Sequence, residues 1–239
     1  RLWWLINLNK VSRYFFSKII ALFAGIVLLL IAYNHNANSL YVISGNAYGT
    51  TWSVSSPQYI ADNHKEAIKN IINDIDYVAS NYKSESEISK INMNFKELEF
   101  VSDELFDILK IAKSVEAISE GYYNIMLGKI SSSLGFAPDF GKNPLQKKLS
   151  TYELDETNRS LIRYSENWFD LSSIAKGYAV QKIHEYLSSS SLNNHLIDIG
   201  GEIIISGSKN GKPWNVGIQN PLSNTDSSTT TINLSLIHI

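Results

Sequence analysis

The most apolar stretch of the chain is the uninterrupted run IIALFAGIVLLLIAY at residues 19–33. Lys10, Arg13 and Lys18 precede this run. Its length suits the core of a signal peptide and is short for a spanning helix, although including residues 14–16 gives a marginal span. A run that is apolar on every side and follows a basic segment predicts a membrane segment rather than a buried core helix. The positive charges before it predict that the N-terminus lies in the cytoplasm and the rest of the chain outside, as for a protein of the bacterial inner membrane.

Residues 1–39 are therefore expected to form a signal sequence or membrane anchor with a short polar linker, and residues 40–239 a single domain. Small residues at 37–39 make a candidate cleavage site, so a cleaved leader and a retained anchor both agree with the pattern. Of the two, we favour the retained anchor.

Beyond residue 39, apolar residues recur with two different periods. A helical period predicts helices at residues 62–80, 84–92, 103–119 and 170–187. Strand-like runs predict strands at residues 40–44 and 50–55, a short hairpin of residues 160–164 and 167–171, and a pair formed by residues 195–207 and 213–219. Residues 137–160 are polar and predict a loop. Mixed helices and strands of this kind indicate a layered α+β or α/β domain.

Two local signals refine these elements. Ser84 and Glu87 stand at capping-box spacing, which predicts that the second helix is capped by Ser84. Residues 223–239 begin as a polar loop and then start a strand that has no evident partner. We therefore expect that the domain is truncated at this end.

The helix expected at residues 170–187 begins unfavourably. Ser172 and Ser173 are good N-cap residues. Lys176, however, puts a positive charge near the positive end of the helix dipole, and Gly177 costs about 1 kcal/mol relative to alanine. Both residues suit a helix end that binds a phosphate. Lysine and the backbone N–H groups would then share one anion, and glycine, which has no side chain, would allow a ligand to approach the backbone closely. The alternative, which local physics alone favours, is a solvated lysine and a glycine that packs the helix onto a sheet.

Composition excludes several classes of function. The chain has 21 Lys and Arg against 23 Asp and Glu, so no basic excess supports a nucleic-acid partner. It has no cysteine, which excludes disulfides, thiolate metal sites and cysteine nucleophiles. It also lacks the glycine-rich nucleotide loops and the nucleophile elbow. The histidines are scattered, and none pairs at the spacing of helical metal ligands: His35, His64, His184, His195 and His238.

Two further stretches carry candidate binding residues. Gly200 and Gly201 interrupt a strand pattern and predict a tight turn or a bulge, beside which Asp198 is solvated or caps the turn. Tyr82 lies between two predicted helices. Its ring could stack on a flat ligand, but an aromatic residue at such a junction more often closes a core.

The order and spacing of these stretches resemble the successive motifs of the ApbE family, over roughly residues 43–221. The motifs are GNAYGTTWSV, ASNYKSESEISKIN, GYYNIMLGKI, FDLSSIAKGYAVQKI and LIDIGGEIIISG followed by PWNVGIQNP. The run D-L-x-x-I-A-K-G-Y-A-V beside D-I-G-G-E-I is the most specific part of the match.

The resemblance implies an α+β fold of mixed sheet and helices and the activity of an FAD:protein FMN transferase. In that family a Ser or Thr of an acceptor protein attacks the FMN phosphorus of FAD, AMP leaves, and a divalent ion, usually Mg²⁺, assists at the pyrophosphate. The implied partner is a flavin-carrying subunit of a membrane redox complex. A protein of the same fold that binds FAD without catalysis is the alternative.

The resemblance also assigns roles by position. Asp170 and Lys176 match FAD-contacting positions, and the backbone carbonyl of Ser173 matches a ligand of the metal. The remaining implied FAD contacts are Tyr48, Tyr82, Tyr122, Tyr123 and Asn124. Asp198, Gly200 and Gly201 match a turn that we expect to be mainly structural. No residue is assigned a catalytic role.

Four positions depart from the family pattern. Tyr48 replaces a methionine, Asn124 an aspartate, Met126 a threonine and Gln181 an aspartate. The family's later T-S-G, H-x-x-D-P-x-T-G and Asp/Thr metal motifs are absent, and the only late histidine is His238. Because Mg²⁺ takes six oxygen ligands, we expect the 239-residue chain alone to be a poor catalyst.

Overall fold

The computed structural model describes residues 2–37, 39–141, 148, 150–219 and 228–234. Two compact units are present, Arg1–Tyr41 and Val42–Ile239. Part of the candidate cleavage site (residue 38), part of the predicted 137–160 loop, and His238 lie outside the described residues.

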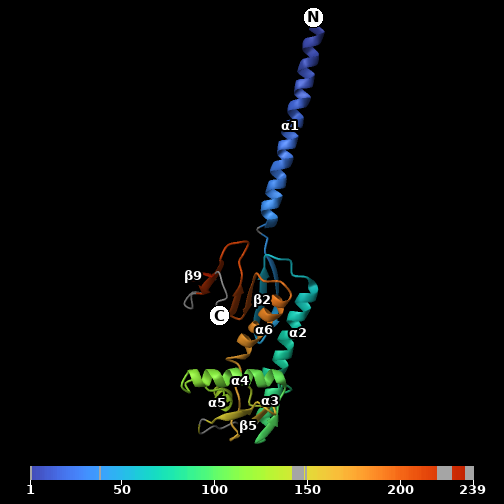
Figure 1. Ribbon diagram of the computed structural model, residues 1–239. Helices are drawn as coiled ribbons and strands as arrows, with labels where there is room; N and C mark the ends of the chain where they lie inside the picture. The colour runs from blue at the N-terminus through green and yellow to red at the C-terminus, as the bar shows by residue number, and fades with distance from the viewer. Residues whose placement is uncertain (1, 38, 142–147, 149, 220–227, 235–239) are drawn as a thin grey trace. The chain divides into compact units, whose positions relative to one another are not determined.

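The N-terminal unit is one long helix, α1 (Leu2–Ala37; Figure 1). Its segment Tyr14–Tyr33 has 20 residues with a mean hydropathy of 2.6 and largely exposed side chains. By length and composition this helix could cross a membrane, and a signal sequence near an N-terminus meets the same criterion. The predicted apolar run is therefore helical, and its role as an anchor stays a prediction.

The main sheet of the second unit has four strands in the order β1-β2-β6-β7. The strands are β1 (Tyr41–Ala47), β2 (Thr50–Ser56), β6 (His195–Ile199) and β7 (Glu202–Ser206). Strand β6 runs antiparallel to both β2 and β7, and its register places Ile199 opposite Trp52. Two helices, α2 (Asp62–Ala79) and α6 (Ala175–Ser189), pack against each other, and α6 also contacts β6 and β7 (Figure 1).

The core between these helices and the sheet is built from the apolar stripes that the sequence predicts. Each fully buried aliphatic side chain contributes about 1.5–3 kcal/mol relative to an exposed one. The buried residues include Trp52, Val54, Ile68, Ile72, Ile75, Ala179, Val180, Ile183, Ile197 and Ile199. This packing holds the start of α6 beside the sheet.

A second, smaller sheet has three antiparallel strands in the order β3-β5-β4. They are β3 (Leu98–Phe100), β4 (Tyr152–Asp155) and β5 (Ser160–Arg163), accompanied by α3 (Glu87–Met93), α4 (Asp103–Ile118) and α5 (Gly128–Ser133). The buried Tyr152 hydroxyl donates to the carbonyl oxygen of Leu109 (3.0 Å) and so ties this sheet to α4. A separate antiparallel pair is formed by β8 (Trp214–Gln219) and β9 (Ser228–Leu234).

The strand pairings differ from the sequence prediction in three places. Strand β4 lies inside the predicted 137–160 loop and takes the place of residues 167–171 as a partner of β5. Residues 195–207 fold back on themselves as β6 and β7 and do not pair with residues 213–219. The tight turn predicted at Gly200 and Gly201 is confirmed, since both have positive φ (59° and 97°) and Asp198 Oδ1 accepts from the Gly201 amide (2.8 Å). Strand β8 pairs instead with β9, so the strand that begins within residues 223–239 does have a partner, which the sequence analysis did not find.

The helix starts also differ from prediction. Helix α3 is capped by Ser86, whose hydroxyl accepts from the Ser89 amide (3.2 Å), and not by Ser84. Helix α6 begins at Ala175 rather than at residue 170. The Asp170 carboxylate accepts from the Ser172 amide (2.9 Å), and this local turn competes with helix formation.

Two glycines in helices allow a direct test of packing. A Cβ at Gly128 would lie 2.7 Å from the carbonyl oxygen of Phe169, whereas a Cβ at Gly177 would meet no atom within 4 Å. We expect Gly128→Ala to lower the free energy of unfolding by about 1–3 kcal/mol, because backbone has to move. Gly177→Ala should instead raise it by up to about 1 kcal/mol through helix propensity. Urea unfolding of the two variants measures both effects, and equal changes would contradict the close approach at Gly128.

Candidate functional site

Three cavities adjoin the turn from Asp170 to Ile174. The first, which we call the tyrosine cavity, has a volume of about 750 Å³ and is lined by Tyr48, Gly49, Ile75, Asp76, Ala79, Ser80, Asn81, Tyr82, Lys83, Ser172, Ala175 and Lys176. The second, the small cavity, has about 270 Å³ and is lined by Tyr122, Tyr123, Asn124, Leu127, Ser131, Asp170, Ser172 and Ser173. The third, the large cavity, has about 1050 Å³ and lies between α4, α6, β7 and β8.

The structure gathers the candidate residues into two neighbouring groups. Tyr48, Tyr82 and Lys176 line the tyrosine cavity. The small cavity collects the other five, namely Tyr122, Tyr123, Asn124, Asp170 and Ser173. Ser172 lines both cavities, although the sequence singled it out only as a helix cap. Residues from distant parts of the chain thus meet at one turn, and their roles toward a ligand stay predictions.

Lys176 points toward the carboxylate of Glu202 on β7. Their Nζ and Oε1 atoms lie 3.5 Å apart, and the two side chains are 29% and 51% exposed. An ion pair as exposed as this contributes little to stability and can be exchanged for another anion. The side chain of Lys176 is therefore neither fully solvated nor committed to one partner, and Gly177 beside it faces open space.

Tyr48 is held by the fold more firmly than its position in a turn suggests. It has a positive φ of 52° in the turn between β1 and β2. Its hydroxyl donates to the carbonyl oxygen of Ile72 on α2 (2.8 Å). Burial, reinforced by the nearby charge of Asp76, raises the pKa of the Tyr48 phenol well above its ordinary value. The hydroxyl therefore stays protonated and joins the hairpin to α2, while the residue lines the cavity.

Tyr82 lines the same cavity but, unlike Tyr48, is mostly exposed. Its side chain is 63% exposed, and its hydroxyl donates to the carbonyl oxygen of Phe136 (2.5 Å). Fixing the hydroxyl orients the ring without covering it. Of the two sequence interpretations of Tyr82, the exposed ring fits a ligand-stacking surface better than a residue that closes a core.

Two hydroxyl-bearing residues, Tyr123 and Ser173, line the small cavity and contact each other. The hydroxyls of Tyr123 and Ser173 lie 3.1 Å apart. Burial raises the pKa of Tyr123, the Ser173 hydrogen bond opposes that shift, and the charge of Asp170 adds to it. Tyr122 is 95% exposed, so its ring contributes only an open edge to this cavity.

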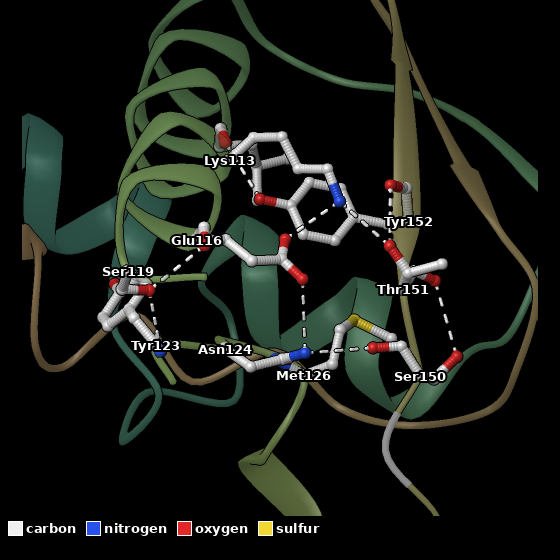
Figure 2. Close-up of polar contacts among 10 residues, drawn as sticks. Lys113, Glu116, Ser119, Tyr123, Asn124, Met126, Ser150, Thr151 and Tyr152 are labelled. Carbon is white, nitrogen blue, oxygen red and sulfur yellow. Dashed lines mark hydrogen bonds and ion pairs between the residues drawn. The ribbon is translucent and has the colours of Figure 1, made fainter. Parts of the chain in front are cut away.

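Asn124 is bound into a network of polar contacts, shown in Figure 2. Its Oδ1 accepts from the amide of Met126 (2.7 Å), while its Nδ2 donates to the carbonyl oxygen of Ser150 (3.2 Å) and to Glu116 Oε1 (3.4 Å). Glu116 also pairs with Lys113, with 2.9 Å between Oε2 and Nζ. Both the oxygen and the nitrogen of the Asn124 amide are thus used in hydrogen bonds within the protein.

Neither acidic residues nor histidines gather into a metal site in the part of the chain that the structure describes. His184 and His195 do meet, with 2.9 Å between Nδ1 of His184 and Nε2 of His195, which their spacing in sequence did not indicate. His195 Nδ1 lies 2.6 Å from the carbonyl oxygen of Leu192 and must donate to it, so Nε2 accepts from His184. Burial lowers the pKa of His195, which favours this neutral hydrogen-bonded pair.

Sequence reasoning missed Asn81 and Asn92 as functional candidates. Both side-chain amides are buried and bind the backbone of Phe169, immediately before the Asp170–Ser173 turn. Both stand in the stretch ASNYKSESEISKIN, which was notable for its motif but gave no reason to single out its asparagines.

Comparison with known proteins places this arrangement in context. The sequence profile of the ApbE family matches residues 48–238. The FAD:protein FMN transferase of Haemophilus influenzae is 30% identical over 202 residues, and that of Vibrio cholerae is 28% identical over 195 residues. Both alignments cover 75% of this chain and 58% of the relative. The chain therefore spans a little over half the length of these curated relatives.

Solved structures show the same fold. The ApbE protein of Thermotoga maritima superposes with a TM-score of 0.69 at 25% identity, covering 83% of this chain and 68% of that one. The flavin transferase ApbE of Vibrio cholerae superposes with a TM-score of 0.67 at 23% identity, covering 77% and 64%. The mixed sheet-and-helix fold expected from the sequence is thus confirmed.

The network around Asn124 predicts what the aspartate of the family pattern would do here. In Asn124→Asp two donors are lost and a carboxylate faces Glu116, so we expect the free energy of unfolding to fall by about 1–3 kcal/mol at pH 7. Protonation relieves the repulsion, so the loss should shrink as the pH approaches about 4, near the ordinary pKa of aspartate. Urea unfolding at several pH values measures the effect. Adding Glu116→Gln should restore the part of the stability at pH 7 that the repulsion removes, although the bond to Ser150 stays lost, and an additive double variant would contradict the contact.

Proposed function

Because the chain belongs to the ApbE family, we propose that it acts in the transfer of FMN from FAD to a protein, the reaction for which its curated relatives are named. One observation carries the proposal. The tyrosine cavity presents an exposed aromatic ring, Tyr82, on one wall and a loosely paired cation, Lys176, at the start of α6 on the other. A flat ring joined to a pyrophosphate is the kind of ligand that such a pair of walls recognises.

The volume of the site agrees with this ligand class. Small-molecule sites commonly have about 300–1,000 Å³, and the tyrosine cavity alone has about 750 Å³. In the proposed complex the flavin lies against Tyr82, and the phosphates lie near Lys176 at the start of α6. The Lys176 ammonium then exchanges its contact with Glu202 for the phosphate oxygens.

The proposed reaction is a phosphoryl transfer. A Ser or Thr hydroxyl of the acceptor protein forms a bond to the FMN phosphorus, the pyrophosphate bond to AMP breaks, and the hydroxyl proton leaves to solvent or to the departing phosphate. Reactions of this type depend mainly on positioning and on neutralising phosphate charge. Lys176 and the helix N-terminus would supply that neutralisation from this chain's own groups.

Magnesium dependence is part of the proposal, but the described residues do not complete a magnesium site. The small cavity offers the carboxylate of Asp170 and the main chain of Ser173, whereas Mg²⁺ takes six oxygen ligands in near-octahedral geometry. The carboxylate of Asp170 is moreover already engaged with the Ser172 amide. The charge neutralisation described above is therefore only the share that the described side chains and backbone would supply.

The proposal extends to location and partner. The basic residues before the apolar segment of α1 support an anchor that places the second unit outside the cytoplasm of a bacterial cell. The acceptor would then be a flavin-carrying subunit of a membrane redox complex, which exposes its Ser or Thr on the same side.

A second candidate function is FAD binding without transfer. It is favoured by Asn124, which stands in place of the family's aspartate and whose amide hydrogen-bonds to the backbone of Ser150 and Met126. The two candidates share the ligand and differ in the covalent step.

The proposed function predicts that Lys176 contributes to FAD binding. We expect Lys176→Ala to weaken FAD binding by about tenfold or more, because charge-assisted hydrogen bonds are worth about 1.5–3 kcal/mol, while helix content holds or rises slightly. Quenching of flavin fluorescence measures the affinity and circular dichroism the helix content. Lys182→Ala is a matched control, since Lys182 lies on the same helix and lines only the large cavity. Unchanged affinity in Lys176→Ala would return this lysine to a solvated role.

The covalent step needs its own measurement. The purified chain is incubated with FAD, Mg²⁺ and an acceptor domain, and covalent flavin is read on a denaturing gel together with released AMP. The transferase proposal predicts one AMP for each flavin attached, at a rate that we expect to be low because the described metal donors are few. FAD that binds and is recovered intact would favour the non-catalytic alternative.

A further inference from the structure

Trp168, Phe169 and Leu171 are buried and Asp170 is partly buried, but residues 168–171 have no neighbouring strand among the described residues. Their peptide groups pair instead with separate parts of the chain. The amide of Gly128 donates to the carbonyl oxygen of Trp168 (2.8 Å), and the amide of Asp170 donates to the carbonyl oxygen of Ile125 (2.7 Å). These two bonds pair peptide groups on either side of Phe169 but leave the amide and the carbonyl group of Phe169 itself without a backbone partner.

Asn92 of α3 supplies partners for Phe169. Its Oδ1 accepts from the amide of Phe169 (2.7 Å), and its Nδ2 donates to the carbonyl oxygen of the same residue (2.9 Å). The side-chain amide therefore makes the two bonds that a neighbouring strand would otherwise make. Asn92 is only 5% exposed, so water does not compete for these bonds.

Asn81, just beyond the end of α2, adds a second pair of bonds. Its Nδ2 also donates to the Phe169 carbonyl oxygen (2.7 Å), and its Oδ1 accepts from the amide of Leu171 (2.8 Å). Asn81 is 7% exposed. We call Asn81 and Asn92 together the asparagine clamp.

The clamp connects the two walls of the tyrosine cavity. On one side, Asn81 directly precedes Tyr82, so holding its amide also holds the start of that wall. On the other side, the chain passes from the fully buried Leu171 to the exposed Ser172 within one residue. A strand paired with residues 168–171 would extend past Leu171 and cover the turn. The side-chain amides of Asn81 and Asn92 bind no further than Leu171 and leave the turn uncovered.

We propose that Asn81 and Asn92 are positioning residues that set the spacing between Tyr82 and the Asp170–Ser173 turn. The inference rests on the proposed function, in which FAD spans both walls. A ligand that touches one wall does not depend on this spacing, but a ligand that bridges both walls does, because its two halves bind together only when the walls are in register.

The test replaces one N–H donor at a time without changing the shape of the side chain. Asn81→Asp and Asn92→Asp each put a carboxylate oxygen against the Phe169 carbonyl oxygen. Asn94→Asp is the matched control, because Asn94 is exposed at the end of the same helix and donates only to the Lys90 carbonyl oxygen (3.0 Å). Affinities of the full purified chain for FAD, riboflavin and ADP are measured by fluorescence and calorimetry.

We expect each clamp variant to weaken FAD binding by about tenfold or more, with changes of about twofold or less for riboflavin and ADP. Asn94→Asp should leave all three affinities unchanged. Equal losses for the three ligands would indicate general damage to the fold and overturn the positioning role, as would unchanged FAD affinity. If an aspartate variant does not fold, the corresponding glutamine variant keeps both amide atoms but displaces them, and the same comparison applies.

Failure of the proposed function gives a different result. If the unaltered chain binds riboflavin and ADP no better than an unrelated protein and does not bind FAD, the flavin site itself is wrong and the positioning role is overturned with it. If the unaltered chain binds FAD and the clamp variants bind it equally well, only the positioning role is overturned.

Discussion

Burial of a backbone segment without a neighbouring strand imposes a strict requirement for hydrogen-bond partners. Each unpaired peptide group in the interior costs about 1–3 kcal/mol, so the peptide groups of Phe169 cannot be left without partners. The chain meets this requirement with Asn81, Asn92 and the main chain of the 125–128 stretch. The end of α2, the helix α3 and the start of α5 are thereby tied to the turn that precedes α6, and this turn adjoins all three cavities.

The electrostatics of the site depend on the same turn. Because the Asp170 carboxylate holds the Ser172 amide, helix α6 starts at Ala175, without a side-chain cap. Lys176 is then a positive group with weak local competition, since Glu202 is half exposed and its contact with Lys176 is long. The turn satisfies the first amides internally, since the amides of Ile174 and Ala175 both donate to the Leu171 carbonyl oxygen, and Lys176 is left as the loosely paired charge at this helix end.

Asn124 shows how a departure from a family pattern can be stable in its own context. The amide bridges Glu116, Ser150 and the backbone of Met126, contacts that an aspartate could make only in part (Figure 2). A carboxylate at this point would be useful near a metal but would repel Glu116. The substitution therefore joins a gain in stability to a loss of one charged group at the small cavity.

The sequence by itself determined the helices α2, α3, α4 and α6, the apolar N-terminal segment and membership of the ApbE family, because periodic burial and local motifs are written in residues that are close along the chain. It also marked Lys176 and Gly177 as an unusual helix start. It did not reveal the short helix α5. Only the tertiary structure decided the pairing of β5 with β4 and of β8 with β9, since many strand partners satisfy the same alternation. Only it brought Tyr48 and Tyr82 to Lys176 and gave Asn81 and Asn92 a role. A buried peptide group finds its partner by position in space, and an asparagine in a sequence does not show which distant carbonyl it will meet.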